Sequence, residues 1–330
     1  MTLDPRPKLR RRTMLAGLGA CLLPMATHAQ DAYPHRLVNV IVPYGAGGGT
    51  DILARVIADE LTTRMGQKFL VENVAGAGGV IGTQKVMSSP ADGYQLLVGS
   101  GSELELMQIT DPTVQLGNWK PLAPVALVGT QPMVLVGRTS LPFSTADELV
   151  AYAKSHPGAL SYASAGVGTQ LHLLGELLKA SAGIDMTHVP YKAAGQIATD
   201  VVGGHTDLAV MVLPSALPHI RSGKMKVFGV SETRRSPAAP DITTLAESAP
   251  FKGVDMAIWY GVFAPGGTPA AIVDRLGKEI GAAAHAPAVQ AKLIPLAVAV
   301  ADDNSAANLE RMKREGLAKL RRLYEASQKK

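Results

Sequence analysis

The sequence has little cysteine and few aromatic side chains. Cys21 is the only cysteine among the 330 residues, and Phe, Trp and Tyr together account for 5% of them. One cysteine excludes an internal disulfide and any metal site made of several thiolates. The chain does not need disulfides, because a protein of about 300 residues buries enough apolar surface to fold without them.

Long hydrophobic runs are also missing. The main apolar run near the N-terminus covers residues 14–24, whereas a helix that spans a bilayer needs roughly 20 residues. Three arginines at 10–12 precede this run and small residues at 27–29 follow it, an order typical of an export signal and its cleavage site. We therefore predict that residues 1–29 are a signal cut near Ala29 and that the mature protein is periplasmic.

The type of export signal stays open. The arginine pair at 11–12 favours a twin-arginine signal over an ordinary secretory signal. A lipoprotein is a third possibility, because residues 18–21 resemble a lipoprotein cleavage box that ends at Cys21. We disfavour it, since residues 22–25 continue the hydrophobic run instead of starting a polar tether.

A strong excess of one charge is absent from the mature chain. The whole sequence has a formal net charge of +5 and a pI near 9.2, but five basic residues and one acidic residue lie within 1–29. Much of the remaining positive charge falls in residues 311–330, where we expect a solvated helix face. We therefore predict no nucleic-acid partner, and local donors rather than net charge have to attract an anionic ligand.

Strand-like runs alternate with segments of helical periodicity from the mature start onward. Residues 38–42 predict the first strand, and a helix follows with Thr50 as its N-cap and Gly66 at its end. Residues 69–71 and 96–98 predict two further strands, with a helix ending near residue 87 between them. This alternation favours parallel α/β layers.

A second series of the same kind begins after two apolar strands predicted at 123–128 and 133–136. It contains helices over 145–155, 169–182 and 194–202 and strands over 160–162, 208–212 and 227–230. A strand over 258–263, a helix over 269–284 and a C-terminal helix then return to the first series. We predict two lobes, a discontinuous one of residues 30–132 and 252–330 and one of residues 133–251, with a ligand cleft between them.

Three glycine-rich loops each join a strand end to a helix start, at 45–51, 75–79 and 164–169. The first backbone N–H groups of a helix have no partner within it and lie at the positive end of its dipole. Such a loop holds a carboxylate or phosphate without arginine or lysine. Each loop taken alone is equally well explained as a tight turn that caps its helix.

Motifs of known enzyme classes are missing. The first loop approaches the dinucleotide-binding pattern, but Thr50 stands at its last glycine, and no Gly-Lys-Ser/Thr of a P-loop occurs there. The sequence has no Gly-x-Ser-x-Gly elbow and no His-Glu-x-x-His helix. Among the scattered histidines we single out His172, which follows the third loop by one turn. It either donates to a ligand or makes a structural hydrogen bond to its own loop.

Several segments together resemble the Bug-type (TctC-like) substrate-binding receptors of tripartite tricarboxylate transporters, over nearly the whole mature chain. They are residues 41–44 with 47–51, 71–73 with 76–79, 92–94, 122–126, 164–168 with 172–173, 188–192, 213–220 and 261–265 with 267–269. The resemblance implies a periplasmic binding protein fold (type II-like), in which two crossover strands join two α/β lobes that close on the ligand. It also implies a carboxylate held by backbone amides and hydroxyls around residues 47–51 and 164–169.

The loops and the resemblance together give a set of predicted ligand-binding residues. These are Tyr44, Gly47, Gly48, Gly49, Thr50, Asp51, Ala77, Gly78, Ser100, Ser102, Glu103, Ser164, Gly166, Gly168, Thr169, His172 and Tyr191.

The chain departs from the family pattern at three places. It has Gly45-Ala46 where many relatives have Pro-Pro or Pro-Gly, Met211 where relatives often have an aromatic or acidic residue, and no Asn-Pro in the segment that begins at Ser102. Glu103 in that segment would repel a polycarboxylate if it faced the cleft; alternatively it points to solvent or caps the next helix. We expect a mono- or dicarboxylate ligand, nitrogen-bearing or aromatic among the options, rather than citrate.

Two roles for such a receptor stay open. It delivers its ligand to membrane transporter subunits, or it reports the ligand to a two-component sensor kinase, since both use the same lobe closure. A third alternative is an exported enzyme acting on an organic acid, for which the sequence offers no nucleophile or metal set. We expect no cofactor, no metal, no catalytic residue and a monomer.

Overall fold

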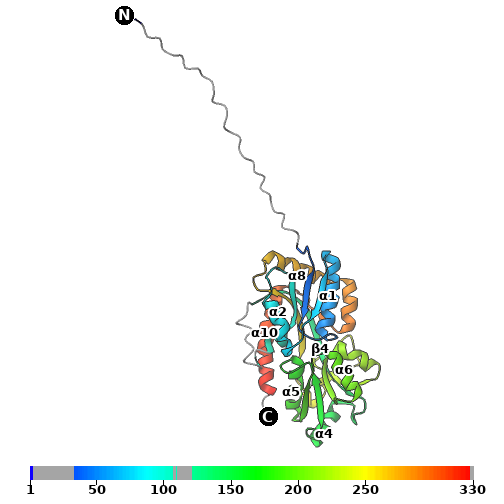
Figure 1. The fold of residues 1–330 in the computed structure, drawn as a ribbon. Coiled ribbons are helices and arrows are strands. Elements are labelled where there is room, and N and C mark those ends of the chain that lie inside the picture. Colours follow the sequence, from blue (N-terminus) through cyan, green and yellow to red (C-terminus); the bar gives the residue numbers. More distant parts are fainter. Residues whose placement is uncertain (3–32, 107–108, 110–120, 328–330) are drawn as a thin grey trace. The chain divides into compact units, whose positions relative to one another are not determined.

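The computed structural model describes residues 1–2, 33–106, 109 and 121–327. Most of the predicted export signal, with Cys21 and the cleavage site at 27–29, lies outside the described residues. From residue 34 onward the described chain forms one compact unit (Figure 1). Within the described parts, no helix combines the length and the apolar character needed to cross a membrane.

The helices and strands follow the predicted alternation, in three runs along the chain. The first run consists of β1 (Val38–Val42), α1 (Gly49–Met65), β2 (Phe69–Asn73), α2 (Val80–Met87), β3 (Gln95–Ser100) and a π-helical turn (Ser102–Leu106). The second consists of β4 (Leu122–Arg138), α4 (Ala146–Ser155), β5 (Leu160–Ser164), α5 (Gln170–Ala182), β6 (Met186–Pro190), α6 (Ala194–Gly203), β7 (Leu208–Val212), α7 (Leu213–Arg221) and β8 (Met225–Val230). The third consists of β9 (Ala257–Pro265), α8 (Ala270–Ala284), α9 (Pro287–Leu293), β10 (Ala299–Val300) and α10 (Ala306–Ser327). Short 3₁₀ turns lie at Ala77–Gly79, Leu245–Glu247, Ala249–Phe251 and Ile294–Leu296.

The strands of the described chain form one sheet in the order β2-β1-β3-β9-β4-β7-β5-β6, with β8 and β10 also paired to β4. β1 is parallel to β2 and β3, and β5 is parallel to β6 and β7. β9 and β4, in contrast, run antiparallel to their neighbours. The expectation of parallel layers is therefore wrong for the centre of the sheet, because periodicity identifies a strand but not its direction.

The strand β4 passes from one part of the sheet to the other. Its first part pairs with β9 as far as Pro132, and from Met133 onward it pairs with β7 and β8. The prediction of two separate strands here is wrong. Residues 129–132 stay extended because Thr130 pairs with both β9 and β10, and Pro132 still pairs with Ala257 of β9. β4 and β9 are the two strands that connect the halves of the sheet.

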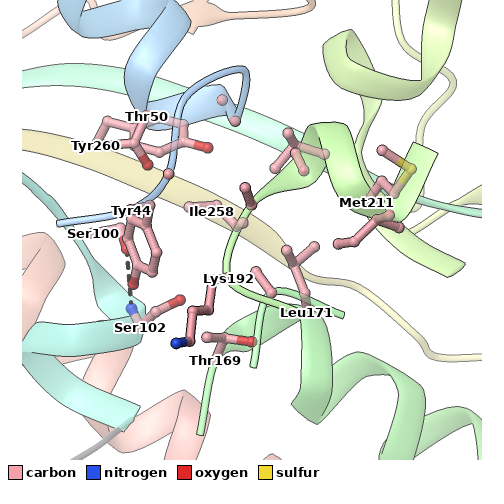
Figure 2. A pocket seen from close by; sticks show the side chains of 18 residues that line it. Tyr44, Thr50, Ser100, Ser102, Thr169, Leu171, Lys192, Met211, Ile258 and Tyr260 are labelled. Atoms are coloured by element: carbon pink, nitrogen blue, oxygen red, sulfur yellow. Dashed lines mark hydrogen bonds between the residues drawn. The ribbon is translucent and has the colours of Figure 1, made fainter. Parts of the chain in front are cut away.

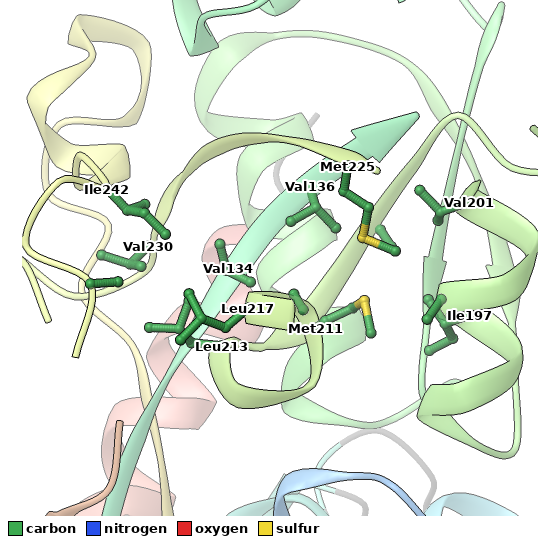
Figure 3. Packing of buried hydrophobic residues seen from close by; sticks show 14 of the residues in the cluster. Val134, Val136, Ile197, Val201, Met211, Leu213, Leu217, Met225, Val230 and Ile242 are labelled. Atoms are coloured by element: carbon green, nitrogen blue, oxygen red, sulfur yellow. The ribbon is translucent and has the colours of Figure 1, made fainter. Parts of the chain in front are cut away.

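Buried side chains form separate clusters along β4. Val134 and Val136 pack with Met211 of β7 and with residues of α6 and α7 (Figure 3). Earlier on the same strand, Leu127 belongs to a cluster that includes Trp259 of β9. Burying one such aliphatic or aromatic side chain contributes roughly 1.5–3 kcal/mol. Each half of the sheet therefore has its own core, and β4 contributes to both.

Local capping fixes the starts and ends of the helices near the site. Gly66 ends α1 in the left-handed conformation, as predicted. The N-cap of α1 is Gly48 rather than Thr50, so the prediction for the start of this helix is wrong by two residues. Thr169 is the N-cap of α5, and its side chain accepts a hydrogen bond from the His172 amide. Both helix starts lie at the same cavity.

Candidate functional site

A small cavity lies where loops and strands from both halves of the sheet meet (Figure 2). Its volume is about 50 Å³, which is the space of a few water molecules at roughly 10–15 Å³ each. The lining residues are Tyr44, Gly45, Gly48, Gly49, Thr50, Ser100, Ser102, Ala165, Thr169, Leu171, Lys192, Ala193, Ala194, Ile197, Met211, Val212, Ile258 and Tyr260.

The start of α1 forms one wall of the cavity. No side chain caps this helix start, so its first-turn amides keep their capacity to bind an anion. Gly49 packs so closely that a Cβ there would lie 2.5 Å from Gln131 Oε1, 2.6 Å from Tyr260 Oη and 3.0 Å from Val212 Cγ2. Only glycine permits this approach of the helix to three strands, β4, β9 and β7.

The Asp51 side chain bonds to residues of its own loop and its surroundings, and it does not line the cavity. Its carboxylate accepts a hydrogen bond from the Gly47 amide at 3.0 Å and one from Asn73 at 3.0 Å, and it pairs with Arg55 at 2.9 Å. Burial by itself raises the pKa of this carboxyl, but the hydrogen bonds from Arg55, Gly47 and Asn73 outweigh it and lower the pKa overall. Asp51 and Gly47, both predicted to bind the ligand, hold the loop in shape and are not among the residues that line the cavity.

Three hydroxyl groups and a buried carboxyl form the polar side of the cavity. The hydroxyls of Tyr44 and Ser100 donate to Glu103 Oε2 at 2.6 and 2.7 Å. The Ser100 amide donates to the other oxygen of Glu103. Ser102 Oγ accepts from the Gln170 amide at 3.1 Å, and the Ser102 side chain also lies within hydrogen-bond reach of the Tyr44 hydroxyl. Glu103 thus lies behind Tyr44 and Ser100 and fixes the orientation of their hydroxyl groups.

Glu103 is fully buried and is not one of the residues that line the cavity. The alternative that it points to solvent is therefore wrong. Burial raises the pKa of Glu103, whereas the hydrogen bonds from Tyr44 and Ser100 oppose the rise. Burial and the neighbouring Glu103 also raise the pKa of Tyr44, so the Tyr44 phenol stays protonated and keeps its donor role towards Glu103.

The loop from Ser164 to Thr169 is tied together by its own side chains. Thr169 Oγ1 donates to the Gly166 carbonyl at 2.8 Å, and Ser164 Oγ lies 2.7 Å from His188 Nε2. The Gly168 amide donates to His172 Nδ1 at 3.3 Å. His172 therefore makes the structural hydrogen bond to its own loop that was one of its two predicted roles.

Lys192 supplies the one positive side chain among the lining residues. It follows β6, and the backbone beside it closes the cavity: a Cβ on Gly45 would lie 2.9 Å from the Lys192 carbonyl and 2.7 Å from Ala193 Cβ. Ser215 Oγ also donates to the Gly47 carbonyl at 2.8 Å. The Gly45-Ala46 pair thus fits a tight contact between the two loops.

The remaining lining is apolar and lies opposite the hydroxyl groups. Figure 2 shows Leu171 and Met211 on one side of the cavity and Tyr44, Ser100 and Ser102 on the other. Val212 and Ile197 complete the apolar side. A ligand with a charged end and a short aliphatic part matches this division.

Seven of the predicted site residues line the cavity, namely Tyr44, Gly48, Gly49, Thr50, Ser100, Ser102 and Thr169. The other ten are not among its lining residues: Gly47, Asp51, Ala77, Gly78, Glu103, Ser164, Gly166, Gly168, His172 and Tyr191. Ala77 and Gly78 belong to the second glycine-rich loop, which lies behind Tyr44 and accepts from its hydroxyl at the Gly78 carbonyl, 3.2 Å away. The Tyr191 hydroxyl donates to Asp200.

The prediction from sequence missed Lys192 and Tyr260. For Lys192 a usable pattern existed, because it follows β6, the parallel neighbour of β5, and the carboxyl ends of parallel strands share one edge of a sheet. Tyr260 lies in the middle of β9, and nothing in its local sequence marks it as a lining residue. In the parts of the chain that the structure describes, no group of three or more His, Cys, Asp or Glu side chains is arranged to hold a metal ion.

Comparison with known proteins agrees with this architecture. Residues 53–328 match the model of the tripartite tricarboxylate transporter family receptor. Protein BugT of Bordetella pertussis is 38% identical over 264 residues, which are 78% of this chain and 79% of BugT.

Two of the similar solved structures carry a small carboxylate. A Rhodopseudomonas palustris protein with adipate has a TM-score of 0.83 and 29% identity, covering 89% of this chain and 98% of its own. MatC of Rhodopseudomonas palustris, with bound malate, has a TM-score of 0.83 and 30% identity, covering 88% of this chain and 100% of its own. The periplasmic binding protein fold that the resemblance implied is thereby confirmed. The chain belongs to the tripartite tricarboxylate transporter receptor family and is a solute-binding receptor of the Bug type.

Proposed function

We propose that this receptor binds a small mono- or dicarboxylate in the cavity between the starts of α1 and α5. The observation that carries the proposal is the set of polar groups around one small volume: the uncapped start of α1, the Ser102 hydroxyl and the Lys192 ammonium. A carboxylate accepts several hydrogen bonds, and charge-assisted bonds of this kind are about twice as strong as neutral ones. Adipate and malate, bound by the two relatives, belong to the same chemical class.

The hydroxyl groups of Tyr44 and Ser100 restrict the kind of carboxylate that we expect to bind. Tyr44 and Ser100 give their protons to Glu103, so towards the cavity they present only lone pairs. A ligand that donates a hydrogen bond there, through a hydroxyl or amino group, gains a partner that a plain alkanoate lacks. We therefore favour a short hydroxy- or amino-carboxylate over citrate, whose third carboxylate would come close to the buried Glu103 behind these hydroxyl groups.

The lobe division is part of this proposal. The residues 30–132 with 252–330 and the residues 133–251 would move as two lobes about the strands β4 and β9. The cavity lies between loops that these lobes contribute, and the Gly45 contact with Lys192 and Ala193 and the bond from Ser215 to Gly47 cross between them. Ligand binding would stabilise the closed arrangement by joining donors of both lobes.

The proposed setting is the periplasm, after removal of residues 1–29, with the membrane subunits of a tripartite tricarboxylate-type transporter as transient partners. The family of this chain supports that setting. Uptake of the bound acid in cells with and without this gene tests the transport role. Loss of a transcriptional response to the acid, with uptake unchanged, would instead support the sensing role.

Isothermal titration calorimetry with succinate, malate, aspartate and citrate tests the ligand class. We expect malate or aspartate to bind more tightly than succinate, which has no donor between its carboxylates. Lys192→Met should weaken binding by about 1.5–3 kcal/mol, the size of a hydrogen bond to a charged group. Lys224→Met, an exposed lysine of the same half, is the matched control and should leave affinity unchanged. Strong binding of citrate alone would contradict the proposal.

A further inference from the structure

A second cavity, of about 240 Å³, lies against the opposite face of β9. Successive side chains of a strand point to opposite faces. Ile258 and Tyr260 line the ligand cavity, whereas Ala257 and Trp259 line the second one. Among the described residues, none lines both cavities, so the second cavity is separate from the site described above.

Three buried side chains at this cavity have polar atoms without a hydrogen-bond partner among the described residues. They are both carboxyl oxygens of Glu105, the amide oxygen of Gln170 and the indole N–H of Trp259. Their exposed fractions are 1%, 3% and 4%. Native proteins rarely leave such groups unpaired, because each unpaired group costs roughly 1–3 kcal/mol. Three of them at one cavity indicate a site built for an occupant.

Two glycines pack closely against the Glu105 carboxyl. A Cβ on Gly101 would lie 2.9 Å from Glu105 Oε2, 3.0 Å from Trp259 Nε1 and 3.3 Å from Gln170 Oε1, so the three polar groups converge beside this residue. A Cβ on Gly316 of α10 would lie 2.7 Å from Glu105 Oε2. Any larger residue at either position would displace the carboxyl from its place at the cavity.

The unpaired atoms call for a donor-rich, positively charged partner. Three of the four are acceptors, namely the two oxygens of Glu105 and the amide oxygen of Gln170. Burial raises the pKa of Glu105 to about 9, and the Trp259 N–H, which approaches the carboxyl, only partly opposes this rise. A cation beside the carboxyl would favour its charged form.

Of the neighbouring lysines, Lys313 is near enough to lower the pKa of Glu105, but neither Lys313 nor Lys319 is hydrogen-bonded to its carboxyl. Lys319 pairs with Asp255 at 3.2 Å, and Lys313 pairs with Glu310 at 2.9 Å. The cavity wall also has the apolar side chains of Met256, Met312, Leu320 and Leu323, together with the polar residues Thr130, Glu315 and Lys319. Methionine side chains adapt to apolar chains of varied shape, and a tryptophan ring attracts an ammonium group.

We propose that this second cavity binds a small primary amine, whose ammonium group donates to Glu105 and to the amide oxygen of Gln170. The alkyl part of the amine lies along Met312, Leu320 and the Trp259 ring. The ammonium offers three donors for the three acceptors. The site is independent of the carboxylate site and does not rest on the proposed transport function.

Calorimetric titration with n-butylamine at neutral pH tests the proposal, with n-butanol as the uncharged probe of the same length. We expect saturable binding of butylamine at millimolar concentration or below, and binding of butanol at least tenfold weaker. Glu105→Gln keeps the shape of the side chain but not its charge, and should weaken butylamine binding at least tenfold. Glu72→Gln, at an exposed ion pair with Lys85, is the matched control and should have no effect.

A second variant covers the case in which Glu105→Gln fails to fold, as judged by circular dichroism. Met312→Trp, at a half-buried position of α10, fills the cavity from its outer side and should abolish butylamine binding. The proposal is overturned if butylamine does not bind, if butanol binds equally well, or if the folded variants bind as tightly as the natural protein. None of these measurements involves a carboxylate ligand, so they fail or succeed independently of the proposed function.

Discussion

The helices α1 and α5 both begin at the ligand cavity, yet they satisfy their first-turn amides differently. At α5, Thr169 caps the helix through its hydroxyl, and His172 accepts from the Gly168 amide. At α1, the N-cap is Gly48 and no side chain caps the helix. A capped helix start has fewer amides to offer an anion than an uncapped one.

Because of this difference, we expect the two halves of the sheet to contribute different groups to ligand binding. We infer that the α1 start provides the backbone donors for the carboxylate, while the α5 start is a fixed scaffold that positions Gln170 against Ser102. The positive charge of the second half comes instead from Lys192 after β6. The two loops look alike in sequence, but only the first leaves its helix start without a side-chain cap.

Among variants that test the difference between the α1 and α5 starts, we expect Gly49→Ala to have the largest effect on stability and affinity. The added methyl would overlap Gln131, Tyr260 and Val212, and overpacking of this kind costs about 1–3 kcal/mol. We expect the free energy of unfolding to fall by that amount in urea denaturation, and carboxylate binding to be lost because the α1 start shifts. Gly195→Ala, at an exposed position of α6 where a Cβ would meet nothing within 4 Å, is the control and should not lower the free energy of unfolding.

A smaller effect is expected for Thr50→Val, measured by calorimetry. Thr50 is buried at the α1 start and lines the cavity beside Tyr260 (Figure 2). Loss of a hydroxyl that bonds a charged ligand costs about 1.5 kcal/mol or somewhat more, so affinity should fall about tenfold while stability stays nearly unchanged. An unchanged affinity would contradict the inference that the start of α1 binds the carboxylate.

Thr169→Val should show the opposite pattern. The Thr169 hydroxyl already donates its proton to the Gly166 carbonyl and accepts from the His172 amide. It therefore has no proton to donate to a ligand. Removing an N-cap costs about 1 kcal/mol, and we expect that loss in the free energy of unfolding with less than a threefold change in affinity. If affinity falls as far as in Thr50→Val, the two helix starts act alike and the comparison fails.

The smallest effect is an acid sensitivity of the second half. Burial, with the nearby His172, lowers the pKa of His188 to about 4, below the value of about 6.5 in an unfolded chain. The unfolded state therefore binds more protons between these values, and the stability contributed by neutral His188 is lost as pH falls from about 6.5 to 4. His188→Gln should make the unfolding free energy less dependent on pH in that window. His156→Gln, at an exposed histidine of the same half, should not.

Much of the fold was predictable from local pattern. The strand at Val38–Val42, the end of α1 at Gly66 and the Thr169 cap of α5 all follow from β-branched runs, a glycine and a capping residue. These features depend on neighbours within a few positions, and so they can be inferred without the tertiary structure. The strand β4 was missed as one element because its continuity depends on pairing with β9 and β10.

The candidate site was predictable only in part. The glycine loops identified where Gly48, Gly49 and Thr50 would lie, but not that Asp51 would turn back to the Gly47 amide. His172 was placed correctly near its loop, yet which of its two roles it takes depended on the distance to Gly168. An anion-binding loop and a self-capped loop have nearly the same sequence, because the same side chains serve either purpose.

The sequence by itself determined the alternation of strands and helices, the three glycine-rich loops and the family to which the chain belongs. Only the tertiary structure decided that Glu103 takes the protons of Tyr44 and Ser100, that Lys192 reaches the cavity, and that β9 separates two cavities. The reason is physical. Propensity and capping act between near neighbours, whereas a cavity and its hydrogen bonds depend on side chains from residue 44 to residue 260 packing together.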